Sequence, residues 1–294
     1  MLWISLPEFE VPELASPEHE PSDPVYRRVR RVFSLSAVKQ DVPLIAPRAV
    51  SCDGEELAAF AVRRILTAIP QDEYPSLFVD CRSSAPVGVP APTYKLATLA
   101  GLTSSLCFAL GGQAGTEVVQ AITFLNHMLG RDTSALISAV QRVVEPDRRQ
   151  PANREQFPLG DASAAISVYG DKPNAPALCL RGVAIGQTET DWPAAFGHLL
   201  PSLLRRAEVK ATDIRWVVSH NYSPSFLRVS QEMFPNAEFC NRRLYSDFNF
   251  GCADSLITLG EWAKRTASVM NGLCAVCFAG MFGCLGLLLL ELHD

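Results

Sequence analysis

The chain has 294 residues, of which 48% are hydrophobic, and a formal net charge of −5. This is enough apolar sequence for a large buried core, built as one large domain or as two fused halves. The acidic balance argues against a general nucleic-acid-binding protein, which needs a basic face. Nine cysteines are scattered, mostly in apolar runs, so we expect buried free thiols in the reducing cytoplasm.

Residues 1–49 are expected to form an irregular N-terminal segment. Residues 7–24 contain five prolines and five glutamates, a composition typical of a loop or an extended arm. Four arginines follow within residues 26–33 and could contact a phosphate group. A solvated strand or helix face is the simpler interpretation of this basic run.

Predicted helices alternate with predicted strands from residue 52 onward. Apolar spacing predicts helices over 52–68, 93–101, 114–129, 191–206, 223–234 and 253–265. Apolar runs predict strands over 77–79, 104–110, 133–144, 161–169, 214–219, 273–279 and 285–292. This alternation is typical of an α/β protein.

The most apolar stretch, residues 273–290, approaches the length of about 20 residues that spans a membrane. It contains Gly280, Gly283 and Gly286, and Glu291 follows it directly. We therefore expect two buried strands joined by a glycine turn and no contact with a membrane.

Five short segments carry a family resemblance. They are Phe108–Gly115, Leu159–Ala165, Trp216–Asn221, Asn249–Ser255 and Phe278–Phe282. In this order they resemble the Ala-Cys-Ala-Gly, Gly-Asp-Gly-Ala-Gly-Ala, His-Gln-Ala-Asn, Gly-Asn-Thr-Ser-Ala-Ala-Ser and Phe-Gly-Gly-Gly-Phe motifs of the β-ketoacyl-acyl-carrier-protein synthase III family. The resemblance covers roughly residues 50–294. It implies a thiolase-like fold, with two pseudo-repeated βαβαβ halves, residues 50–170 and 171–294, in a five-layered α-β-α-β-α arrangement.

The resemblance also implies roles for individual residues. In the family, a cysteine at the start of a buried helix takes an acyl group, and a histidine and an asparagine bind the thioester oxygen of the second substrate. Carried over by position, the donor pair is His220 and Asn249, and the turn glycine of the oxyanion hole is Gly280. Gln113 stands where the family has its cysteine. A carboxamide is not a useful nucleophile, so condensation through an acyl-enzyme is not expected.

Other cysteines are weaker candidates for a nucleophile. Cys107 precedes Gln113 by six residues but lies in a predicted buried strand, and Cys252 and Cys284 are less favoured still. Cys274 and Cys277 have the spacing of a metal or redox motif, but on a strand such residues point to opposite faces. We therefore expect core packing for this pair and no metal site.

Three residues are expected to contact the substrate: Phe250, Met281 and Phe282. Phe250 and Met281 are larger than the family's residues at these positions and should narrow any acyl pocket.

Three functions are compatible with this pattern. The first is a non-condensing partner of an active ketosynthase in fatty-acid or polyketide-type biosynthesis. The second is a malonyl-carrier-protein decarboxylase that uses His220 and Asn249 to form a starter unit. The third is a cysteine-independent acyltransferase with His220 as the base. The expected partners are an acyl carrier protein and a homologous ketosynthase subunit. No cofactor is expected beyond the phosphopantetheine or CoA that carries the substrate.

Overall fold

The computed structural model describes residues 2–15, 46–47, 49, 52–70, 73–83, 92–112, 115–142, 156–187, 191–266, 271–280 and 283–292. Eleven strands of this part of the chain belong to one mixed sheet. Its first half contains β1 (Trp3–Ser5), β5 (Leu77–Arg82), β6 (Leu106–Gly111), β7 (Ser134–Gln141) and β8 (Ala162–Tyr169). Its second half contains β9 (Ala177–Gln187), β10 (Ile214–Ser219), β11 (Glu238–Cys240), β12 (Gly272–Ala279) and β13 (Cys284–Leu292).

The two halves of the sheet repeat one strand order. Numbered along the chain within each half, the strands lie in the order third, second, fourth, fifth, first. In each half the fifth strand runs antiparallel to the fourth, whereas the second is parallel to both of its neighbours. The two first strands, β1 and β9, pair antiparallel at the centre of the sheet. The pseudo-repeat is therefore visible in the topology itself.

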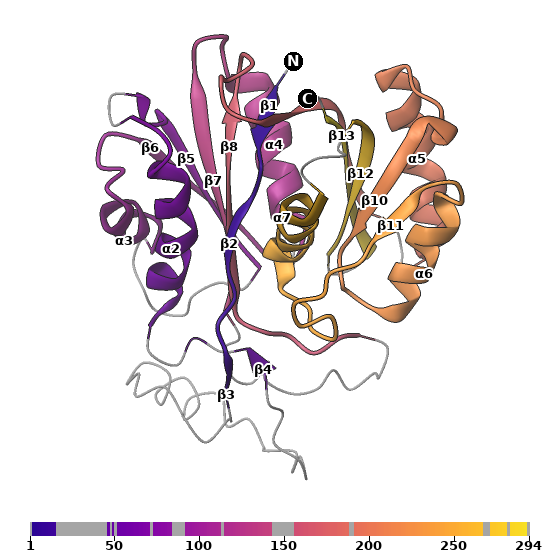
Figure 1. The fold of residues 1–294 in the computed structure, drawn as a ribbon, viewed down its shortest axis with the longest axis horizontal. Helices are drawn as coiled ribbons and strands as arrows, with labels where there is room; N and C mark the ends of the chain where they lie inside the picture. Colours follow the sequence, from indigo (N-terminus) through magenta and orange to yellow (C-terminus); the bar gives the residue numbers. More distant parts are fainter. Residues whose placement is uncertain are drawn as a thin grey trace.

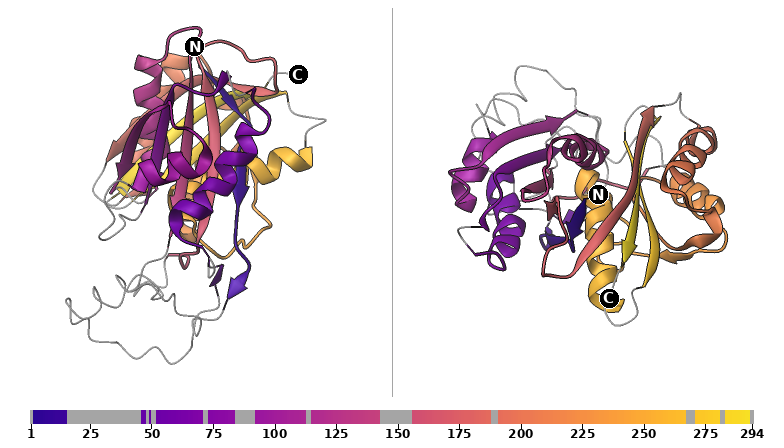
Figure 2. Two further views of the ribbon diagram at one scale, coloured as in Figure 1. Left: turned by 90° about the vertical axis from the view of Figure 1, so that its left-hand side faces the viewer. Right: turned by 90° about the horizontal axis from the view of Figure 1, so that it is seen from above.

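The six helices in the described part of the chain complete five layers, and Figure 1 shows these layers side by side. On one outer face lie α2 (Gly54–Leu66) and α3 (Pro92–Ala100), and on the other lie α5 (Trp192–Ala207) and α6 (Pro224–Met233). Two buried helices, α4 (Glu117–Met128) and α7 (Asp254–Thr266), lie between the halves of the sheet and contact strands of both. Figure 2 (right) shows this layering from above, with α7 in the middle. The predicted α/β fold with five layers is confirmed.

Local sequence explains where two of these helices begin. Asp53 caps α2 by accepting a hydrogen bond from Glu56 N (2.9 Å), and the Glu56 carboxylate accepts one from Asp53 N (2.8 Å). Ser223 caps α6 by accepting from Phe226 N (3.1 Å), and Pro224 occupies the first helical position. Both arrangements satisfy backbone donors that would otherwise lack partners.

The apolar stretch near the C-terminal end is a strand pair, as predicted. Strands β12 and β13 pair antiparallel from Gly272↔Leu292 to Ala279↔Leu285. No helix in the described ranges is long and apolar enough to cross a membrane.

The expectation of an irregular segment over residues 1–49 is wrong for its described part. Strand β1 lies between β8 and β9, with Leu2 and Ile4 buried, and it supplies the first strand of the first half. Strand β2 (Glu8–Glu10) pairs with β8, and β3 (Leu14–Ala15) pairs with β4 (Ala46–Pro47). Strands of two or three residues are too short to show a period, so composition alone suggested a loop. The arginine-rich run at 26–33 lies outside the described residues.

Two further strands, β9 and β11, were not predicted. Strand β9 contains Arg181, Gly182 and Gly186, which interrupt its apolar pattern. Its long pairings with β13 and its short one with β1 compensate for this weak local signal.

Candidate functional site

His220 follows the last residue of β10 and is fully buried. Its Nδ1 accepts a hydrogen bond from Ala279 N (3.2 Å), so the ring proton lies on Nε2, which donates to Asn249 Oδ1 (2.8 Å). Burial lowers the pKa of His220, and the Asp254 carboxylate only partly opposes this effect. The ring of Tyr222 packs edge-on against the imidazole, with centroids 5.8 Å apart. His220 is therefore a neutral imidazole with a defined tautomer.

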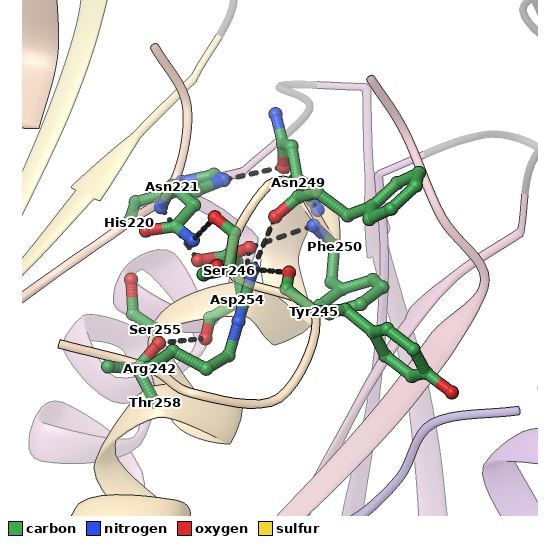
Figure 3. Close-up of polar contacts among 12 residues, drawn as sticks. His220, Asn221, Arg242, Tyr245, Ser246, Asn249, Phe250, Asp254, Ser255 and Thr258 are labelled. Atoms are coloured by element: carbon green, nitrogen blue, oxygen red, sulfur yellow. Dashed lines mark hydrogen bonds and ion pairs between the residues drawn. The ribbon is translucent and has the colours of Figure 1, made fainter. Parts of the chain in front are cut away.

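Asn249 is held by the loop that precedes β8. Its backbone N–H donates to Pro158 O (2.9 Å), and its carbonyl accepts from Gly160 N (3.0 Å). Its side-chain Oδ1 accepts from Gly251 N (2.7 Å) as well as from His220. This second bond fixes the orientation of the amide, and Nδ2 points away from His220 (Figure 3). Among the described residues, Nδ2 has no hydrogen-bond partner.

The start of helix α4 packs directly on this pair. Gly115 has φ +148°, and a Cβ atom there would lie 1.9 Å from Ala279 O and 3.0 Å from His220 Cε1. Only glycine permits this close approach and this backbone conformation. Gln113 precedes Gly115 by two residues and lies outside the described part of the chain.

The role expected for Gly280 is not supported. Its N–H donates to Cys284 O (2.8 Å) and closes the turn between β12 and β13. The N–H is therefore occupied by the hairpin and is not free to bind a substrate oxyanion. Met281 and Phe282, both expected to contact substrate, lie outside the described residues.

Phe250 packs in the interior of this structure, and its expected contact with substrate stays a prediction. Its side chain is fully buried, and the guanidinium of Arg242 lies 4.5 Å from its ring centroid. On another side, a Cβ added to Gly160 would lie 2.6 Å from the Phe250 ring. The ring thus faces the interior, although its backbone follows Asn249.

A buried ion pair beside the site was not predicted. Arg242 Nη1 lies 2.8 Å from Asp254 Oδ2, and both side chains have no solvent exposure. Asp254 is the first residue of α7, where a carboxylate also interacts favourably with the helix dipole. A charged residue in the otherwise small and apolar run 250–255 was the available signal.

None of the described cysteines has the features of a reactive nucleophile. All nine are free thiols. Burial raises the pKa of Cys107, Cys252, Cys274, Cys277 and Cys284. A raised pKa keeps these thiols protonated and unreactive at neutral pH. The described residues also contain no group of three or more potential metal ligands.

Comparison by sequence found no matching family model and no matching curated protein. Comparison with solved structures found similar chains over nearly the full length. The 3-oxoacyl-(acyl carrier protein) synthase III of Pseudomonas aeruginosa PAO1 is 17% identical, with a TM-score of 0.71 over 100% of this chain and 98% of the other. The corresponding synthase of Aquifex aeolicus VF5 is 12% identical, with a TM-score of 0.73 over 99% and 100%. AbyA1, a tetronic acid condensing enzyme, is 16% identical, with a TM-score of 0.69 over 99% and 100%. The chain therefore has the thiolase-like fold of the ketosynthase III enzymes.

Proposed function

We propose that this protein binds a malonyl-type thioester and decarboxylates it to the acetyl thioester without condensing it. The thioester would be carried on the phosphopantetheine of an acyl carrier protein or on CoA. The observation that carries this proposal is the buried His220–Asn249 pair, in which the neutral imidazole N–H is bonded to Asn249 Oδ1 and the amide N–H2 points away from His220.

These two donors match the charge that decarboxylation creates. The bond between the α-carbon and the carboxylate breaks, carbon dioxide leaves, and its bonding electrons form an enolate on the thioester oxygen. Asn249 Nδ2 is available to donate to that oxygen. The His220 Nε2–H must first leave Asn249 Oδ1, and Oδ1 would then still accept a hydrogen bond from Gly251 N. A proton from water then completes the acetyl group. Hydrogen-bond donors aimed at a developing oxyanion typically make the largest single contribution to transition-state stabilisation.

Condensation is disfavoured by two independent features. The sequence resemblance implies that Gln113 stands at the position of the family's nucleophile, and an amide cannot hold an acyl group. The Gly280 N–H, which would stabilise the oxyanion during acylation, is already bound to Cys284 O.

The hydrogen bonds of His220 give no support to a cysteine-independent acyltransferase function. Nδ1 of His220 accepts from Ala279 N, and Nε2 carries the proton. Neither ring nitrogen has a free lone pair with which to deprotonate an acceptor.

The decisive experiment follows malonyl-carrier protein and malonyl-CoA by mass and measures released carbon dioxide. The Asn249→Asp variant keeps an oxygen for His220 and Gly251 but removes the Nδ2 donor and adds a negative charge. We expect its decarboxylation rate to fall roughly 10²–10³-fold. Asn236→Asp makes the same chemical change at an exposed turn and should retain the wild-type rate. Wild-type protein that leaves both malonyl thioesters intact would refute the proposal.

A second candidate, the non-condensing partner subunit, is favoured by an open strand edge. Strand β6 pairs only with β5 among the described strands, and Leu106 on it is 58% exposed. Phe124 and Met128 on the neighbouring α4 are also exposed, and Phe124 contacts Phe108 of β6 at 5.5 Å between ring centroids. An apolar open edge of this kind is typical of a surface that another chain covers. We propose that an active, homologous ketosynthase chain pairs here.

Co-expression with such a ketosynthase, followed by light scattering of the purified complex, tests this second candidate. Leu106→Lys should dissociate the complex, because it places a charge on the paired edge. Phe60→Lys changes an equally apolar, exposed side chain on α2 and should leave the complex intact. Failure of the wild-type chain to associate with the ketosynthase would contradict the subunit function.

A further inference from the structure

Asp254 binds the two backbone positions that directly follow the donor pair. Its Oδ1 accepts from Asn221 N (2.7 Å), and Asn221 follows His220. Its Oδ2 accepts from Phe250 N (2.8 Å), and Phe250 follows Asn249. Figure 3 shows this carboxylate at the junction of the two segments. A single side chain on α7 thus links the end of β10 to the loop that carries Asn249.

Arg242 supports the same junction from the other side. It pairs with Asp254 Oδ2, and its Nη2 donates to the carbonyl oxygens of Phe248 and Tyr245. Its guanidinium also packs over the ring of Phe250. The loop that ends at Asn249 is therefore held through backbone groups on both sides of that residue.

Stability alone does not explain this buried pair. Removing two charges from water has a large free-energy cost, and buried ion pairs can often be replaced by apolar side chains without loss of stability. The contacts of Asp254 and Arg242 instead go to the segments that carry the two donors. The chain has a second buried pair, Arg82 with Asp80, whose contacts go to Glu55 and Thr93. It offers a comparison of similar burial without contacts to the site.

We infer that Asp254, held by Arg242, is a positioning residue that sets the placement of His220 Nε2–H relative to Asn249. The inference rests on the proposed decarboxylation for its effect on rate, but its structural part does not depend on that activity. In Asp254→Asn, one of the two acceptor oxygens becomes an N–H2 group that faces a backbone N–H or Arg242. One of the two segments must then move, and the bond between His220 and Asn249 must lengthen.

The experiment measures His220 by nitrogen-15 NMR and the decarboxylation rate in the same variants. In Asp254→Asn we expect the His220 Nε2–H resonance to shift and its exchange with solvent to accelerate at least roughly tenfold. We also expect kcat to fall roughly 100-fold with little change in KM, because displaced donors act on the transition state. Asp80→Asn, the matched control, should leave both the resonance and kcat at wild-type values, even if its thermal stability falls.

The outcomes separate the two proposals. A shifted His220 resonance in Asp254→Asn, with wild-type protein inactive on malonyl thioesters, supports positioning and refutes only the decarboxylase. An unchanged resonance in folded Asp254→Asn overturns positioning whatever the activity. If Asp254→Asn does not fold, the charge-balanced double variant Asp254→Asn with Arg242→Met replaces it, and wild-type resonance and rate in that variant overturn the inference.

Discussion

A methyl group at Gly115 tests whether the start of α4 sets the geometry of the donor pair. In Gly115→Ala the new Cβ would lie 1.9 Å from Ala279 O and 3.0 Å from His220 Cε1. Carbon–oxygen contacts in proteins are normally about 3.3 Å or longer, so these groups must separate by more than 1 Å. The peptide of Ala279 also carries the N–H that donates to His220 Nδ1, so the displacement reaches the imidazole.

Two terms set the expected size of the effect. Overpacking a rigid site costs about 1–3 kcal/mol. Holding an alanine at φ +148°, a conformation suited to glycine, costs about 1–3 kcal/mol more. We expect a total near 3–5 kcal/mol and, at about 2 °C per kcal/mol for a chain of this size, a fall in Tm of roughly 6–10 °C. Misplacement of a donor by about 1 Å should reduce the rate of the proposed decarboxylation roughly 100-fold.

Thermal denaturation by circular dichroism, with the His220 resonance as a local probe, measures both effects. The matched control is Gly170→Ala, whose Cβ would lie 1.9 Å from Gly130 O, in a turn away from the site. This variant should lower Tm through overpacking alone, without the cost of holding an alanine at a positive φ. It should leave the His220 resonance unchanged. If Gly115→Ala has wild-type stability and a wild-type His220 spectrum, the proposed packing of α4 on the donor pair is wrong.

Three further predictions concern stability. Gly197→Ala should raise the free energy of unfolding by about 0.5–1 kcal/mol in urea titrations, because Gly197 lies inside α5 with open space around its Cα; a loss of stability would contradict this. Asp53→Ala should lower it by about 1 kcal/mol by removing the α2 cap, and Asp53→Ser should recover most of the loss. The lowered pKa of His220 means that the unfolded chain, with a histidine pKa of about 6.5, binds this proton more readily than the folded chain does. The contribution of His220 to stability is therefore complete above pH 6.5 or so and is lost as pH falls toward the folded pKa; a His220→Gln variant with unaltered pH dependence in urea titrations would contradict this.

Local pattern predicted the helices well, because each amphipathic helix carries its own period. The observed α3 and α6 begin and end within one residue of the predicted 93–101 and 223–234. Strand β10 has its predicted bounds, 214–219. Strands β1 and β9 were missed because their positions depend on partners far away in the chain rather than on a local period.

The sequence likewise predicted some of the site residues and missed others. His220 and Asn249 were found through short motifs, and the structure brings them into contact. Asp254 and Arg242 were missed, because their importance lies in the backbone groups that they bind and not in their spacing. The packing of Phe250 against Arg242 could not be predicted, since adjacency to Asn249 says nothing about which way its ring points.

Strand β1 imposes an order on the assembly of the sheet. It pairs through Trp3 with both Tyr169 and Cys179, so it closes loops of more than 160 residues. Contacts this distant in sequence form slowly, because the entropy of closing the loop is lost before the pairing stabilises it. Strand β1 precedes β8 and β9 in the chain and cannot pair until both are present, so until then the edges of β8 and β9 that face β1 stay unpaired. Chaperones that bind exposed strand edges would bind the folding chain at these unpaired edges.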